Sequence, residues 1–178
     1  DHVVKLSNYT IWRHWPDLAE VPNPHLAMLD RVIDLQCELV AHWMGAGFVH
    51  GVMNTDNVAV SGETLDYGPC AFMDRFAANT VFSSIDAHGR YAYGRQPQIM
   101  HWNMARFAEA LLPAIHSVSP DDVEAAKALV DAIPGRFRAH WDERMRAKLG
   151  LVQGGADDRA LVVDLFAELE KHSVDFTG

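Results

Sequence analysis

Residues 50–57 read HGVMNTDN, and this polar stretch decides how the rest of the chain is interpreted. It has no helical periodicity, and two short runs that are candidates for strands follow it at 58–60 and 64–67. The turn residues Ser61-Gly62-Glu63 separate these runs, so the pattern predicts a small β-hairpin beside a polar loop.

The predicted hairpin gathers polar side chains that could carry chemistry. Asn57 lies just before the first strand and Asp66 lies in the second, so a tight hairpin brings both toward one point. Their oxygens are hard ligands that suit Mg²⁺ with bound phosphates, and Asp56 could accept a proton. A structural interpretation also fits, in which Asn54, Asp56 and Asn57 bond their own backbone as turn residues. Spacing alone leaves both interpretations open.

Helices are predicted on both sides of this region. Asn23 and Pro24 are typical of a helix start, and an apolar face at helical spacing then extends to Met44, which predicts a helix of about 22 residues. Gly45 and Gly47 are expected to end it.

Helical patterns resume at His101 and continue to the end of the chain. Starts or faces recur at Ser119–Asp122, Phe137–Leu149 and Leu161–Leu169, and Gly150 is expected to end the second of these helices. Three aromatic residues at helical spacing are predicted to be core: Trp102, Phe137 and Trp141. The predicted fold class is mainly α with a small β-hairpin.

Composition limits the classes of function. The 178 residues are 49% hydrophobic and 22% charged, as in an ordinary globular domain, and the formal net charge is −9. An acidic chain without a basic run is expected to bind neither nucleic acid nor an anionic membrane. Cys37 and Cys70 are predicted to be free thiols in a reducing compartment, and a disulfide between them is the alternative.

The motif at 50–57, followed by Leu65-Asp66-Tyr67-Gly68-Pro69, resembles the selenoprotein O (SelO/YdiU) family. Further matches extend the resemblance over about residues 40–112, and they are Gly89-Arg90-Tyr91, Gln96-Pro97 and Trp102-Asn103-Met104-Ala105-Arg106, with weaker ones at Asn8-Tyr9 and Arg13-His14.

The resemblance implies a protein-kinase-like fold, with this chain corresponding to most of its C-terminal lobe (α+β). Within residues 1–178 it implies a catalytic loop and metal-binding hairpin at 48–70, an activation-loop-like segment at 68–100 and a helical body at 101–176. The N-terminal lobe would lie upstream, because Lys5 is the only lysine before Lys127 and its surroundings do not match a phosphate-binding lysine. The isolated chain is therefore expected to be inactive.

The resemblance also implies an activity: transfer of AMP from ATP to Ser, Thr or Tyr hydroxyls of proteins. Asp56 would be the proton acceptor, since Val52 stands where kinases carry their catalytic Asp. Asn57 and Asp66 would hold Mg²⁺ or Mn²⁺, with Asp66 also contacting ATP. An ordinary phosphotransferase and a non-catalytic pseudokinase scaffold are the alternatives, and a bacterial cytoplasmic location is expected.

Three further residues of the motifs have two interpretations each. His50 is expected to be a hydrogen-bonded scaffold residue rather than a base. Arg90 and Tyr91 lie in the long loop, where they could contact a protein substrate or simply pack within the loop.

Overall fold

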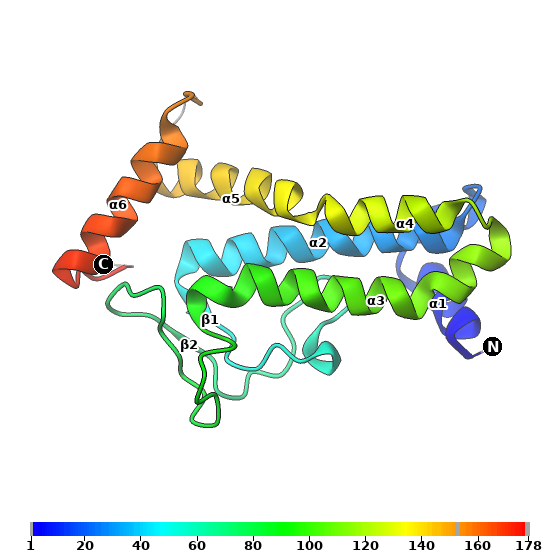
Figure 1. Ribbon diagram of the computed structural model, residues 1–178, viewed down its shortest axis with the longest axis horizontal. Helices are drawn as coiled ribbons and strands as arrows, with labels where there is room; N and C mark the ends of the chain where they lie inside the picture. Colours follow the sequence, from blue (N-terminus) through cyan, green and yellow to red (C-terminus); the bar gives the residue numbers. More distant parts are fainter. Residues whose placement is uncertain (1, 152–153, 177–178) are drawn as a thin grey trace.

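The computed structural model describes residues 2–151 and 154–176, and it is mainly helical with one small antiparallel sheet. The long helix α2 packs against α3 on one side and α5 on the other, while α6 crosses one end (Figure 1). The helices are α1 (His2–His14), α2 (Pro24–Ala46), α3 (Gln96–Val118), α4 (Asp122–Asp131), α5 (Ile133–Leu149) and α6 (Asp158–His172). Three short 3₁₀ helices are η1 (Pro16–Glu20), η2 (Thr55–Asn57) and η3 (Tyr93–Arg95).

Helix α2 has the bounds that its sequence predicts. The Asn23 side chain accepts a hydrogen bond from Leu26 N at 3.2 Å, and Gly47 ends the helix with φ 71°. The prediction that Gly45 helps to end it is wrong, since this glycine lies inside the helix. A Cβ there would meet Arg144 Cγ at 2.6 Å, so Gly45 allows α5 to approach α2 closely.

The predicted hairpin around residues 61–63 does not form as two strands. A single bridge joins Val58 and Thr64, whereas the paired strands are β1 (Phe48–Val49) and β2 (Ala71–Phe72), with Phe48 opposite Phe72. Asp66 has φ 56°, a left-handed conformation that a strand cannot contain. The chain therefore leaves the extended conformation at the residue expected to lie in the second strand.

Helix α3 begins at Gln96, before the predicted start at His101, because Pro97 is favourable in a first helical turn. The prediction that Trp102 belongs to the core is wrong, since its side chain is 43% exposed. The buried face instead includes Asn103 and Met104. Phe137 and Trp141 pack against the core from α5 as partly buried residues, and Gly150 ends that helix with φ 68°.

The irregular segment after β2 is held to the helices by specific contacts. The Tyr93 hydroxyl donates to Met44 O at 2.7 Å, and burial raises the pKa of that phenol. Phe76 packs against Phe166 of α6 and against Phe176, whose N–H donates to Asp74 O. The long loop predicted for 68–100 is thus irregular over most of its length but anchored to the helices at several buried residues.

Within the described part of the chain, no helix is both long and apolar enough to cross a membrane.

Both cysteines are free thiols, as predicted, and the alternative of a disulfide between them is wrong. Cys37 lies on the buried face of α2, where burial, with a smaller contribution from Asp34, raises the pKa of its thiol to about 12. Cys70 is half-buried just before β2.

We therefore expect only Cys70 to react with iodoacetamide at about pH 8, since only about one Cys37 thiol in ten thousand would be ionised. Peptide mass spectrometry after timed labelling measures the two rates, and labelling in urea should modify both residues. Equal rates in the folded protein would contradict the described burial of Cys37.

Candidate functional site

His50 is the buried centre of the polar loop, with 0% of its surface exposed. Its Nε2 lies 2.6 Å from Leu65 O, and its Nδ1 accepts a hydrogen bond from Val52 N at 3.3 Å. The second contact requires an unprotonated Nδ1, so Nε2 carries the hydrogen and donates to Leu65 O. His50 thus joins the two motif segments as a hydrogen-bonded scaffold residue, as predicted, and it is not placed to act as a base.

Gln96 fixes the chain that enters the loop. Its buried side chain accepts from His50 N at 3.0 Å and donates to Phe48 O at 3.0 Å. Asn103 lies about two turns further along α3, and its side chain donates to Met53 O at 3.1 Å. The roles of Gln96 and Asn103 were not predicted, although both residues belong to the motif matches and each is a polar side chain on an otherwise apolar helix face.

Asn57 and Asp66 come together as predicted, although the hairpin that motivated the prediction is reduced to one bridge. Asn57 donates one amide hydrogen to Asp66 Oδ2 and the other to Val52 O, both at 3.0 Å. These two bonds orient the amide, and its carbonyl oxygen has no hydrogen-bond partner among residues 2–151 and 154–176.

Asp56 lies in η2, next to Asn57, and its side chain is exposed. No hydrogen bond or ion pair engages its carboxylate within the described chain. The alternative in which Asp56 bonds its own backbone as a turn residue therefore finds no support at this side chain. The carboxylate is therefore open to solvent at the surface of this turn.

The donor set fits a hard divalent cation. The Asn57 carbonyl oxygen and the Asp66 carboxylate are oxygen ligands from adjacent side chains, and Mg²⁺ commonly takes one or two protein carboxylates, with water and phosphate completing its shell. Among the described residues, no group of three or more His, Cys, Asp or Glu side chains could hold a metal by itself. A cation here would thus depend on phosphate or water for its remaining ligands.

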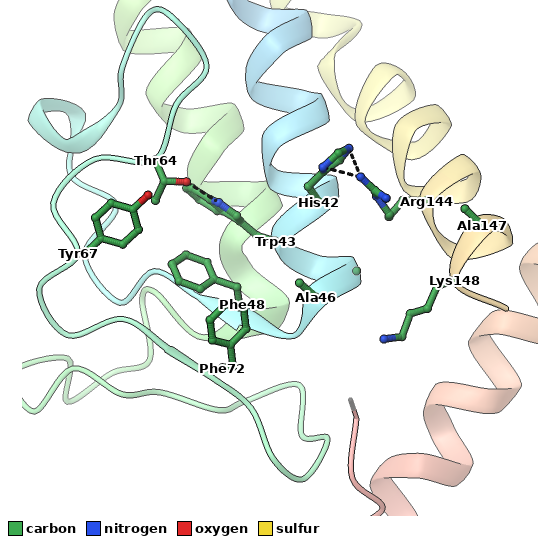
Figure 2. Close-up of a pocket in the computed structure, with 11 residues that line it drawn as sticks. His42, Trp43, Ala46, Phe48, Thr64, Tyr67, Phe72, Arg144, Ala147 and Lys148 are labelled. Carbon is green, nitrogen blue, oxygen red and sulfur yellow. Dashed lines mark hydrogen bonds between the residues drawn. The ribbon is translucent and has the colours of Figure 1, made fainter. Parts of the chain in front are cut away.

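A cavity of about 590 Å³ borders the segment that carries Asp66. Figure 2 shows Thr64 and Tyr67 on one side of it and His42 and Arg144 on the other, with aromatic side chains between. The Trp43 indole N–H donates to Thr64 Oγ1 at 3.0 Å, which anchors this segment to α2. Arg144 also lines this cavity, and its guanidinium donates a hydrogen bond to His42.

The loop motif at residues 89–91 is also tied to the candidate site. The Tyr91 hydroxyl donates to Asn54 Oδ1 at 2.5 Å, while Asp86 accepts from the backbone N–H groups of Arg90 and Tyr91 at 2.8 Å each. These bonds hold residues 86–91 against the turn that contains Asp56.

Comparison with known proteins identifies the family. A family model described as "Protein adenylyltransferase SelO" matches residues 1–178. The chain belongs to the SelO family. The match confirms the resemblance of the motifs and extends it over the whole chain.

Three relatives illustrate the similarity within the SelO family, and each is named protein nucleotidyltransferase YdiU. The relative from Sphingopyxis alaskensis is 78% identical over 99% of this chain, that from Geobacillus kaustophilus 51% over 97%, and one from Cereibacter sphaeroides 52% over 99%. The chain spans 36–37% of the length of these curated relatives.

We expect Gln96→Leu to lower the free energy of unfolding by about 2–5 kcal/mol, because it leaves His50 N–H and Phe48 O buried without partners. Urea unfolding followed by circular dichroism measures the change. The matched control is Gln98→Leu, an exposed position on the same helix, which should stay within about 0.5 kcal/mol of the parent. Equal losses for the two variants would contradict the role of Gln96.

Proposed function

We propose that this chain is the catalytic-loop region of a protein adenylyltransferase, which transfers AMP from ATP to Ser, Thr or Tyr hydroxyls of proteins. The observation that carries the proposal is the contact of Asn57 with Asp66, beside the exposed carboxylate of Asp56. The names of the family and of the relatives support the same class of reaction.

A protein-kinase-like C-terminal lobe is the fold proposed for this function. The order of its parts supports it: a long helix, a short strand, the loop of His50 and Asn57, and then the segment of Asp66. In this proposal residues 48–70 form the catalytic and metal-binding region, 68–100 the activation-loop-like segment and 101–176 the body, although the helix of that body begins at Gln96. An N-terminal lobe would supply the remaining contacts to ATP.

Each site residue has a separate task. Asp56 accepts the proton of the attacking hydroxyl, because its carboxylate is exposed and has no partner in the described chain. The hydroxyl oxygen bonds to the α-phosphorus of ATP as the bond from that phosphorus to pyrophosphate breaks, and pyrophosphate leaves. Asn57 and Asp66 would hold Mg²⁺ or Mn²⁺, which neutralises charge on the phosphates of ATP when it is bound. Through the same carboxylate, Asp66 helps to position the nucleotide.

Two alternatives are separated by one assay of the full-length protein. Label transferred from α-labelled ATP indicates AMP transfer, whereas label from γ-labelled ATP alone indicates a phosphotransferase. Measurable ATP binding without any transfer indicates a pseudokinase scaffold. Val52 argues against the phosphotransferase, because the usual kinase base is missing at that position. A bacterial cytoplasmic location belongs to the same proposal and is supported by the bacterial sources of the relatives.

In the full-length protein, Asp56→Ala should lower AMP transfer about 10²–10⁴-fold, the range of general acid–base catalysis, with little change in ATP binding. Asp66→Ala should lose metal and nucleotide binding as well. Turnover with α-labelled ATP and isothermal calorimetry with ATP and Mg²⁺ measure the two effects.

The matched control is Asp131→Ala, an exposed carboxylate on α4, which should leave both measurements unchanged. Val52→Asp restores the kinase pattern and should give little phosphate transfer, because upstream residues would set the orientation of ATP. Near-normal AMP transfer by Asp56→Ala would show that Asp56 is a structural turn residue and not the proton acceptor.

Residues 1–178 alone should bind ATP only at millimolar concentrations or more weakly, because much of the nucleotide contact in kinase-like sites comes from the N-terminal lobe. Calorimetry on this chain beside the full-length protein tests the expectation. Micromolar binding by the chain alone would refute the division of the site between two lobes.

A further inference from the structure

An exposed stack of two arginines and a tryptophan lies beside the candidate site. The Arg90 guanidinium lies 5.1 Å from the centre of the Trp102 ring, and the Arg106 guanidinium lies 5.5 Å from it. All three side chains are exposed, although Trp102 was expected to be core. Stacking on the ring holds both cations in place without neutralising their charge.

The stack places two guanidinium groups together on the surface of a chain of net charge −9. No carboxylate lies within ion-pair distance of Arg90 in the described chain, and the nearby Asp86 accepts bonds from the backbone of residues 90 and 91. Arg106 pairs with Glu109 at 2.5 Å, which leaves Arg90 as the less neutralised cation of the two. The surface is therefore complementary to a carboxylate, with Arg90 the stronger contact.

This surface is continuous with the candidate catalytic turn. Tyr91, whose ring also lies under the Arg90 guanidinium at 5.7 Å, bonds to Asn54, two residues before Asp56. A cavity of about 290 Å³ lies between the turn and α3, and most of its wall is apolar. Its lining includes Thr55, Val58, Met104, Arg106 and Phe107.

We propose that the Arg90–Trp102–Arg106 stack and this cavity dock the protein substrate through a segment that carries acidic residues next to an apolar one. The acidic side chains bind the stack, and the apolar side chain enters the cavity. The nearby hydroxyl is then directed toward Asp56. This inference rests on the proposed AMP transfer for the hydroxyl, whereas the docking itself requires only binding.

The test uses the full-length protein and two fluorescein-labelled peptides, Glu-Glu-Leu-Tyr-Gly and Lys-Lys-Leu-Tyr-Gly, with binding followed by fluorescence anisotropy. At about 50 mM salt, the acidic peptide should bind about tenfold or more tightly than the basic one, and the preference should shrink as salt rises. Arg90→Glu should abolish the preference, and Arg106→Glu should reduce it less. Arg90→Lys should retain part of it, because charge remains while the planar stacking is lost.

The matched control is Lys127→Glu, which makes the same change of charge at an exposed position on α4 and should leave the preference within about twofold. Melting curves identify any variant that fails to fold, and Arg90→Gln then replaces Arg90→Glu.

Equal binding of the two peptides, or an equal effect of Lys127→Glu and Arg90→Glu, would overturn the docking proposal. So would displacement of the acidic peptide by an oligothymidylate that binds more tightly, since Trp102 and the arginines would then serve a nucleic acid. The proposed function fails separately. A preference for the acidic peptide without transfer of label from α-labelled ATP would refute AMP transfer but support the docking surface. AMP transfer without a preference for the acidic peptide would refute the docking surface but support AMP transfer.

Discussion

The buried amide of Gln96 is the constraint on which the rest of the polar loop depends. It accepts a hydrogen bond from His50 N and donates one to Phe48 O. No helix or wide sheet is present at residues 48–50 to satisfy these backbone groups. A buried backbone N–H or carbonyl without a partner costs about 1–3 kcal/mol, so this side chain determines where the loop begins. His50 then carries the constraint onward, since its ring bonds to both Val52 and Leu65.

The candidate site inherits its geometry from these buried contacts rather than from regular secondary structure. Asn57 and Asp66 meet at 3.0 Å although only one bridge joins the two segments that carry them. His50 fixes one segment relative to the other from inside, and Trp43 anchors Thr64 from α2. A rigid, buried support beneath exposed functional groups is the arrangement that positions side chains closely enough for catalysis.

Local signals in the sequence were sufficient for much of the fold. The start of α2 at Asn23 and its end at Gly47 follow from capping chemistry, which involves only neighbouring residues. The convergence of Asn57 and Asp66 was also predictable, because a short connection limits how far they can separate. The strands around residues 61–63 were overpredicted, since such short candidate strands do not reveal that Asp66 leaves the extended conformation. Gln96 and Trp102 were missed because their partners lie elsewhere in the chain, and helical spacing cannot tell which side of a helix another segment covers.

Position 66 shows how the demands of folding and of charge can oppose each other. The left-handed backbone of Asp66, with φ 56°, costs roughly 1 kcal/mol or more in a residue that has a Cβ atom, and glycine would avoid this cost. Asparagine would tolerate the same backbone about as well as aspartate. Neither shape nor backbone strain therefore requires an aspartate here. What distinguishes it from both substitutes is its negative charge, so thermal stability alone would be a misleading guide to which residue this position needs.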